Sequence, residues 1–590
     1  MAHKTVMELF DATARSHASK PALKAKKDGR WVETTWAEYR EQIRTAARGF
    51  VKLGLEPGQG VSILGGNRPE WLVADVGAIY AGGFPAGIYT TSSAEQCQYI
   101  ADHSDSAIVV VENAEQLAKI LEVRGQLPKL KAIVLMSGDS SVEGVHTWAR
   151  TMELGRSVPE SELDARTAAQ KPDDVCTLIY TSGTTGNPKA VMITHHNLVW
   201  TSRATFEAFG GALPDERAIS YLPLSHIAEQ AISIYAAATA GGCTWFAESL
   251  EKLGENLREV RPTLFVGVPR VWEKIQAKIL EVGAQSSPLK KRIGAWARKQ
   301  GLAGGYADQR HEARPLLYGL AEALVFKKVR ANLGLDECRF AITAAAPIAK
   351  STLELFLSLG IPIYEVYGMS ECTGPATLSL PGAYKTGKVG KPVPGTEVKL
   401  AADGEVLMRG PHVFKGYYKN EEATRETLDE EGWLHSGDVG VIDAEGFLQI
   451  TDRKKDLLIT AGGENIAPQL LEGMLKGIAG VSQAVVVGDR QKFLAALVTL
   501  DPAKLPSIAS EAGSPAKDMR AASECPKIHT WMLTRLDEVN RHLARVQTIK
   551  KVKVLPAELT IESGELTPTM KVKRKVVNER YAAEIAAFYD

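Results

Sequence analysis

Short apolar runs alternate with amphipathic stretches through most of the first 450 residues of the chain, and this alternation constrains the fold most strongly. The apolar runs at 61–64, 108–111 and 132–135 are typical of buried strands. Amphipathic stretches at 36–53 and 70–80 predict helices between them. Because strands that alternate with helices usually form a mainly parallel sheet, we predict an α/β fold for this part of the chain.

The pattern changes in the rest of the chain. Short strands with Gly-rich turns at 403–448 predict a small β-rich lobe. After the charged stretch 451–456, strands predicted at 484–487 and 494–500 and a long helix predicted near 529–545 indicate a separate α+β unit. We therefore predict a large N-terminal α/β domain with a β-rich lobe over residues 1–453 and a small C-terminal α+β domain over 454–590.

Composition excludes several classes of protein. Lys and Arg total 70 and Asp and Glu total 70, so the zero net charge argues against a dedicated nucleic-acid binder. The six cysteines have no metal-ligand spacing, and reduced cytoplasmic thiols are expected. We expect no secretory signal, because no apolar core follows the first lysine. The weakly charged run 231–247 is shorter than a membrane span and predicts a buried helix and strand.

The most specific segment is 180–190, Tyr-Thr-Ser-Gly-Thr-Thr-Gly-Asn-Pro-Lys-Ala, which follows a strand-like run at 175–179. Its glycines and small hydroxyl residues let successive backbone N–H groups converge on an anion, and its lysine adds positive charge. A flexible polar hairpin turn is the alternative, but a turn needs no hydroxyl run before a lysine. We predict a phosphate-binding loop made by Thr181, Ser182, Gly183, Thr184, Thr185, Gly186 and Lys189.

This loop resembles the phosphate-binding signature of the adenylate-forming superfamily, which includes acyl-CoA synthetases, luciferases and peptide-synthetase adenylation domains. Ala190 stands where the family usually has glycine. The other signatures follow in the family's order, at 344–347, 367–371, 433–438, 452–456, 462–465 and 566–574. A lone Asp or Arg is usually a solvated surface charge, but the matched order and spacing favour one nucleotide site.

The resemblance implies roles for residues around the nucleotide. Tyr367 and Gly368 belong to the motif whose tyrosine stacks on adenine, Ser370 approaches the α-phosphate, and Glu371 holds Mg²⁺ together with Thr184. A carboxylate suits a hard divalent ion that bridges phosphates. A serine nucleophile is the competing interpretation, but Gly-x-Ser-x-Gly fails because position 372 is Cys. Ala345 would flank adenine, although alanine runs are usually core.

Further residues are assigned by the same resemblance. Asp438 would accept hydrogen bonds from the ribose hydroxyls, and Arg453 would bind the same ribose or a phosphate. Lys455 falls at the family's hinge, and Gly463 lies in the loop that approaches coenzyme A after the small, mobile domain rotates. Lys571 is the family's catalytic lysine, although a basic tail of this kind is often only solvated. His226 would border the reacting carboxylate, although a lone His is more often a satisfied core group.

Segments 87–97, 266–274 and 564–570 are most similar to the bubblegum group of long-chain acyl-CoA synthetases. The resemblance implies a ligase that uses ATP, Mg²⁺ and coenzyme A to convert a fatty acid first to acyl-AMP and then to acyl-CoA. Three alternatives stay open. The enzyme could pass the acyl group to a carrier protein, its substrate could be an aryl or short-chain acid, or the chain could be a non-catalytic lipid-binding relative.

The segment 290–330 differs from the rest of the chain, with ten Lys or Arg residues against three acidic ones. Leu289, Ile293 and Trp296 fall on one helical face. Leu317, Leu320 and Leu324 do the same on a second predicted helix. These faces predict either a peripheral contact with a membrane surface or helices whose apolar stripes pack on the large domain, and both interpretations stay open.

Overall fold

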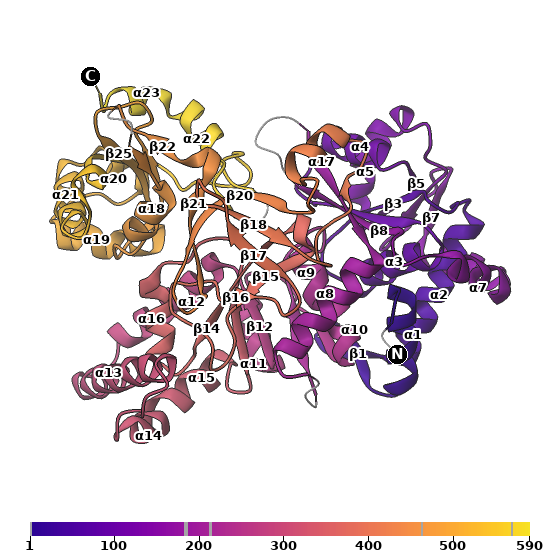
Figure 1. Ribbon diagram of the computed structural model, residues 1–590, viewed down its shortest axis with the longest axis horizontal. Helices are drawn as coiled ribbons and strands as arrows, with labels where there is room; N and C mark the ends of the chain where they lie inside the picture. The colour runs from indigo at the N-terminus through magenta and orange to yellow at the C-terminus, as the bar shows by residue number, and fades with distance from the viewer. Residues whose placement is uncertain (1–2, 182–186, 212–214, 462–463, 568–569, 590) are drawn as a thin grey trace.

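The computed structural model describes residues 3–181, 187–211, 215–461, 464–567 and 570–589. Its first large sheet has the strand order β19 (Gly416–Tyr417), β9 (Lys189–Thr194), β8 (Val175–Thr181), β4 (Phe84–Ile88), β3 (Gly60–Leu64), β5 (Ser106–Val111), β6 (Ala132–Leu135) and β7 (Val145–Thr147) (Figure 1). The strands from β8 to β7 run parallel, and β9 and β19 are added antiparallel at one edge.

A second large sheet has the order β16 (Lys391–Pro392), β15 (Gly374–Leu378), β14 (Ile363–Met369), β13 (Phe340–Thr343), β12 (Leu264–Gly267), β10 (Arg217–Ser220), β11 (Cys243–Phe246), β1 (Pro21–Lys27) and β2 (Arg30–Thr35). Its middle strands are parallel and its edges antiparallel. The predicted α/β fold is therefore confirmed, but the parallel strands divide into two sheets. Periodicity within single segments does not say which strands pair.

Helix α3 (Pro69–Tyr80) explains how the first sheet is covered. Every residue from Trp71 to Tyr80 is buried, and the helix packs on β3 and β4. A helix that is apolar on all sides is stable only inside a protein, so α3 lies in the core. The run 231–247 forms the π-helical turn η2 (Ala231–Ala236), α10 (Ala237–Ala240) and β11, as predicted. Among the described residues, none of the helices has the length and apolar character needed to cross a bilayer.

The predicted β-rich lobe is an antiparallel sheet of β17 (Glu397–Leu400), β18 (Glu405–Arg409), β20 (Leu434–Ile442) and β21 (Leu448–Arg453). After it, β22 (Leu458–Ile459) and β23 (Asn465–Ile466) form a hairpin, and β24 (Val481–Val487), β25 (Leu494–Leu500) and β26 (Ile549–Val554) form a small sheet. This last sheet has an apolar core of its own, which includes Leu471, Val498 and Met532. The domain division between residues 453 and 454 stays a prediction.

The long C-terminal helix α21 (Pro526–Asn540) ends five residues before the predicted end at 545. The Asn540 side chain accepts a hydrogen bond from the Ile549 backbone N–H at 3.0 Å and donates one to its carbonyl at 2.9 Å. These bonds tie the last helical residue to the start of β26, so the chain must leave the helix there. A contact of this kind leaves no periodic signal in the sequence.

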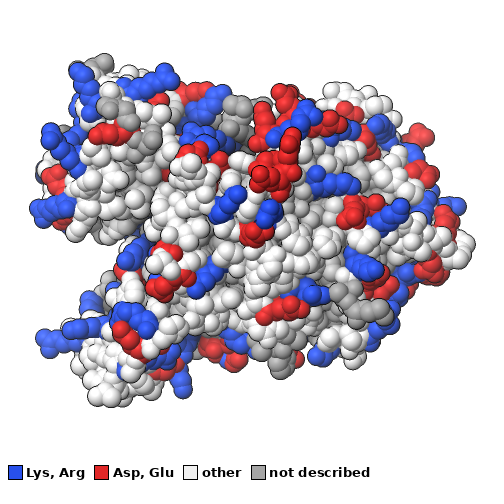
Figure 2. All heavy atoms as spheres, in the orientation of Figure 1, with Lys and Arg blue, Asp and Glu red and all other residues white. Residues whose placement is uncertain are grey.

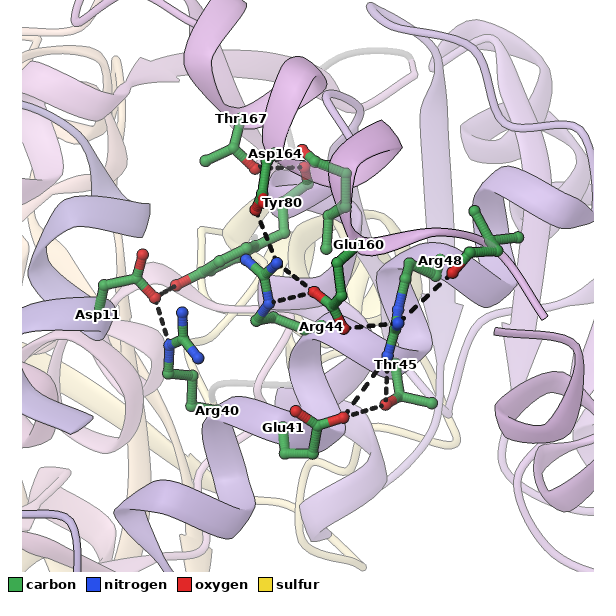
Figure 3. Close-up of polar contacts among 12 residues, drawn as sticks. Asp11, Arg40, Glu41, Arg44, Thr45, Arg48, Tyr80, Glu160, Asp164 and Thr167 are labelled. Carbon is green, nitrogen blue, oxygen red and sulfur yellow. Dashed lines mark hydrogen bonds and ion pairs between the residues drawn. The ribbon is translucent and has the colours of Figure 1, made fainter. Parts of the chain in front are cut away.

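Four helices near the N-terminus are joined by a cluster of charged residues, defined here as the α2 cluster (Figure 3). Arg44, on α2 (Trp36–Lys52), donates to Glu160 at 3.0 Å and to Asp164 at 2.7 Å on α7 (Glu160–Ala169). Arg48 lies 2.5 Å from Glu160. Asp11, on α1 (Val6–Ser16), accepts a hydrogen bond from the Tyr80 hydroxyl of α3 at 3.0 Å and one from Arg40 Nε of α2 at 2.6 Å.

The basic segment forms a projecting helical arm, with α13 (Pro288–Gln309) followed by α14 (Tyr318–Ala321), η3 (Glu322–Phe326) and α15 (Lys327–Leu333) (Figure 1). The buried face of α13 is made of glycine and alanine. A Cβ at Gly301 would lie 2.1 Å from the Ser358 carbonyl oxygen, and one at Gly304 would lie 2.3 Å from the Tyr318 ring. Side chains there would force the helices apart, so these glycines set how closely the arm packs.

Candidate active site

The base of the predicted phosphate loop is an antiparallel hairpin. Strands β8 and β9 place Thr181 opposite Lys189, and the Thr181 hydroxyl donates to the Lys189 carbonyl at 3.4 Å. Ser182, Gly183, Thr184, Thr185 and Gly186 lie outside the described residues. The structure thus shows where both ends of the loop are held.

Glu371 lies beside this hairpin, in the short 3₁₀ turn Ser370–Cys372 that follows β14. Strand β19 runs beside β9 and brings Tyr417 between the two: its hydroxyl donates to Glu371 Oε1 at 2.7 Å, and Lys189 Nζ lies 4.9 Å from its ring centroid. Burial raises the pKa of Glu371, while the Tyr417 hydrogen bond and the positive charges of Arg453 and Lys189 lower it. Sequence reasoning missed Tyr417, because Gly416-Tyr417 reads as an ordinary strand.

Close backbone packing fixes the position of this turn. A Cβ at Gly368 would lie 1.8 Å from the Gly374 carbonyl oxygen, because β15 folds back directly over β14. Ser370 is buried at the start of the turn. The Cys372 thiol is also buried and bonds within the turn, donating to the Met369 carbonyl at 3.3 Å. Only glycine fits at 368, which explains the Tyr-Gly pair of the motif in terms of packing.

Tyr367, Asp438 and Arg453 form a connected polar group. The Tyr367 hydroxyl donates to Asp438 Oδ2 at 2.8 Å, and Arg453 Nε lies 3.3 Å from Asp438 Oδ1. Asp438 and Arg453 face each other across the antiparallel pair of β20 and β21. A carboxylate has about four acceptor positions, so Asp438 keeps room for further donors such as ribose hydroxyls.

Lys571 reaches this group from the C-terminal part of the chain. Leu566 pairs with Val572 in an antiparallel bridge. Thr567 N–H donates to the Lys571 carbonyl at 2.8 Å, and Lys571 N–H donates to the Thr567 hydroxyl at 3.0 Å. The pKa of Lys571 is lowered to about 8: burial and the charge of Arg453 lower it, and the charges of Asp438 and Glu371 partly oppose them. The side chain therefore lies within electrostatic reach of three predicted site residues.

His226 lies near Lys571 as well. It caps helix α9 (Ile227–Gln230), with Nδ1 accepting from the Ala228 N–H at 3.2 Å. Burial, together with the charge of Lys571, lowers the pKa of His226 to about 4, so the ring is neutral at pH 7. Glu229, which the sequence analysis did not single out, accepts hydrogen bonds from the Ser233 hydroxyl at 2.6 Å and from the Leu222 N–H at 3.3 Å. These bonds tie together the segment 222–233, which carries His226.

Three predicted residues remain. Lys455 lies in the 3₁₀ turn Lys454–Asp456, where burial lowers its pKa and the charges of Arg453 and Lys189 add to the effect. Ala345 follows β13 with a left-handed φ of 74°, unusual for a residue other than glycine. Gly463 lies outside the described residues. Lys455 thus shares the surroundings of Arg453 and Lys189.

Helix α12 (Pro269–Ala284) contacts the C-terminal part of the chain that carries Lys571. Arg270 donates from Nη2 to Ser482 Oγ and to Glu558 Oε1, both at 3.0 Å. On the same helix Glu273 lies 3.7 Å from Lys476. These residues are far apart in the sequence, and the sequence analysis did not single them out.

No group of three or more metal-binding side chains comes together in the described part of the chain. Mg²⁺ shared with phosphates is commonly held by only one or two protein carboxylates. Glu371 fits that pattern, because it is a buried carboxylate beside the phosphate-loop hairpin with one oxygen already hydrogen bonded to Tyr417.

A family model described as AMP-binding enzyme matches residues 10–418, and one described as AMP-binding enzyme C-terminal domain matches residues 455–590. The long-chain-fatty-acid–CoA ligase ACSBG2 of Xenopus laevis is 44% identical over 99% of this chain and 84% of its own length. ACSBG1 of Homo sapiens is 40% identical over 99% of this chain and 85% of its own length.

The same fold occurs in the crystal structure of the anthranilate CoA ligase AuaEII in complex with anthranoyl-AMP. Its TM-score is 0.74 at 20% identity, over 99% of this chain and 98% of that one. The predicted resemblance to the bubblegum group is confirmed by the ACSBG relatives. The chain belongs to the AMP-binding enzyme family.

Proposed function

We propose that this protein is a long-chain fatty acid–CoA ligase that forms acyl-AMP and pyrophosphate from a fatty acid and ATP, and then transfers the acyl group to coenzyme A. One observation carries the proposal: Lys571 of the C-terminal part lies within electrostatic reach of Glu371, Asp438 and Arg453. The named relatives, about 40% identical over nearly the whole chain, support the long-chain substrate.

In the first half-reaction the carboxylate attacks the α-phosphate of ATP, and pyrophosphate leaves. Both reactants are anions, so the site must align them and offset their repulsion. We assign this role to Lys189, Arg453 and Lys571, whose positive charges would stabilise the negative charge gathered in the transition state. Mg²⁺ bound at Glu371, with Thr184 of the loop, would supply further positive charge on the phosphates.

The nucleoside would be oriented by the group around Asp438. Asp438 already accepts from Tyr367 and pairs with Arg453, so its carboxylate is held in one orientation for the ribose hydroxyls. Tyr367 would stack on adenine, with Gly368, Ser370 and Ala345 shaping the pocket around the base and the α-phosphate. Neutral His226 would border the fatty carboxylate without attracting a proton from solvent at pH 7.

In the second half-reaction the sulfur of coenzyme A attacks the acyl carbonyl, and AMP leaves. We propose that the small domain, residues 454–590, rotates about Lys455 between the steps. The rotation would remove Lys571 and bring in the loop of Gly463. The Arg270 contacts with Ser482 and Glu558 would then belong to the first step only.

ATP–pyrophosphate exchange with acids from short to very long chain length tests the proposal. Each buried CH₂ contributes about 0.8 kcal/mol, roughly fourfold in selectivity, until the tail reaches the end of its pocket. Exchange should therefore increase with chain length into the long-chain range. A preference for acetate or benzoate over palmitate would contradict the substrate assignment.

We place the enzyme in the cytoplasm, because all six cysteines are free, as a reducing compartment keeps them. An acyl-AMP ligase that loads a carrier protein is the second candidate. It would show the same exchange, but its release of AMP would not depend on coenzyme A.

A further inference from the structure

The helical arm exposes a row of leucines. Leu316 is fully exposed, and Leu317 at the N-cap of α14, Leu320 on α14 and Leu324 on η3 are 49%, 50% and 46% exposed. Leu289 and Ile293 on α13 are also exposed, at 68% and 38%. The stripe on α14 and η3 therefore does not pack on the large domain. Trp296 differs, because it packs inward against Ala297, Ala321 and Phe326.

The charges of the arm divide into two sets. Each of its three acidic residues is already paired with an arginine of the arm: Asp308 with Arg314 at 2.7 Å, Glu312 with Arg310 at 2.8 Å, and Glu322 with Arg330. The seven remaining cations are exposed and make no ion pair with any residue of the described ranges: Lys290, Lys291, Arg292, Arg298, Lys299, Lys327 and Lys328. The arm's whole positive excess is thus open to a partner.

We propose that this arm, residues 288–333, binds the surface of a bilayer that contains anionic lipids. The exposed leucines would enter the acyl boundary, and the seven unpaired cations would meet the lipid phosphates and carboxylates. In Figure 2 the projecting part at the lower left is largely white at its tip, with Lys and Arg side chains along its edges. Exposed apolar side chains beside unpaired positive charges match a surface that is apolar inside and negatively charged outside, as an anionic bilayer is.

A lipid surface fits the arm better than an acidic protein does. An interface with a protein partner usually contains cations held in defined orientations and aromatic side chains that fill pockets of the other protein. The arm instead presents flexible lysines and separate leucines, with its one tryptophan packed inward. The inference rests in part on the proposed function, because long-chain fatty acids partition into bilayers and an enzyme attached there meets its substrate.

Vesicle co-sedimentation of the full chain, without ATP, coenzyme A or fatty acid, tests the surface independently of the reaction. The chain should sediment with phosphatidylcholine vesicles that contain phosphatidylserine, and added salt should weaken this binding because it screens exposed charges. The combined change Lys290→Glu, Lys291→Glu and Arg292→Glu should lower the partition coefficient at least about tenfold. Leu320→Gln with Leu324→Gln should lower binding while leaving its salt dependence intact.

The matched control makes the same total change of charge at three lysines outside the arm. Lys52, Lys171 and Lys550 are exposed lysines outside the arm with no ion pair to the described residues, and their replacement by glutamate should leave binding within about twofold. All variants should catalyse ATP–pyrophosphate exchange at the wild-type rate when a water-soluble medium-chain acid is the substrate, which shows that they are folded. Wild-type chain that stays in the supernatant at low salt would overturn the proposal and favour an acidic protein as partner. Equal loss in the control would overturn the assignment to the arm.

Discussion

The α2 cluster and the candidate active site both bring basic and acidic side chains together, but with opposite results. In the α2 cluster the cations are satisfied by the protein itself: Arg44 binds Glu160 and Asp164, and Arg48 binds Glu160 (Figure 3). In the candidate site, Lys189 and Lys571 form no ion pair with a described residue, and burial lowers the pKa of Lys571 to about 8.

This difference indicates what each region does. A buried cation with two carboxylate partners stabilises the fold, and removing one partner leaves a costly unpaired charge. A buried lysine without a partner weakens the fold, so the protein keeps it only where a ligand supplies the negative charge. The contrast predicts that changes in the two regions separate stability from catalysis.

The largest effect is expected from Lys571→Ala. Adenylation should fall about a hundredfold, or ~3 kcal/mol, while conversion of supplied acyl-AMP to acyl-CoA is spared. Thermal stability should not fall, because the substitution removes a partly buried charge without an ion-pair partner among the described residues. Single-turnover assays of the two half-reactions measure this, with the exposed Lys575→Ala as the control. Equal losses in both steps would show that Lys571 does not act in adenylation alone.

Arg44→Ala should show the opposite behaviour. Asp164 loses its ion-pair partner and Glu160 keeps only Arg48, and because both carboxylates are exposed the expected loss is about 2 kcal/mol of unfolding free energy. Activity per folded molecule should stay near wild type. Denaturant unfolding gives the first quantity and an active-site titration the second. Arg150→Ala, which removes an exposed ion pair with Glu153, should cost no more than ~0.5 kcal/mol. A similar loss in both variants would remove the distinction between buried and exposed pairs.

The pH dependence of adenylation should report Lys571 directly. The protonated form is complete well below pH 8 and is lost as the pH rises through its pKa of about 8. The kcat/KM for ATP should therefore fall tenfold per pH unit above that point. In Lys571→Arg the guanidinium stays protonated, so the plateau should extend upward. A descending limb at the same pH in this variant would assign it to another group.

The smallest effect is expected at the contact between the two parts. Arg270→Ala removes the bonds to Ser482 and Glu558, so the arrangement with Lys571 at the site becomes less populated. Adenylation should fall about fivefold, and thioester formation from supplied acyl-AMP should not fall. Lys278→Ala, on the same helix, removes only a surface pair with Glu281 and should change neither step. Slower thioester formation in Arg270→Ala would contradict the proposed rotation.

The sequence predicted most of what is local. Strands such as Ala132–Leu135 and helices such as Trp36–Lys52 follow from period and propensity, and the β-rich lobe follows from its turns. The motifs also predicted that Glu371, Asp438, Arg453 and Lys571 belong to one site, and the structure brings these side chains together. Their catalytic roles stay predictions.

What the sequence did not predict depends on contacts between distant segments. Tyr417 reaches Glu371 only because β19 pairs with β9, and Arg270 reaches Glu558 only through the packing of the two parts. The exposure of Leu320 and Leu324 is likewise a property of packing, because an amphipathic stripe has the same sequence whether it is buried or exposed.

Product analysis tests the central claim most directly. The purified chain is incubated with palmitate, ATP, Mg²⁺ and coenzyme A, and each nucleotide and acyl product is quantified. The account predicts AMP, pyrophosphate and palmitoyl-CoA in equal amounts, with steady-state release of AMP lost when either palmitate or coenzyme A is omitted. Formation of ADP, or AMP release that does not depend on coenzyme A, would contradict it.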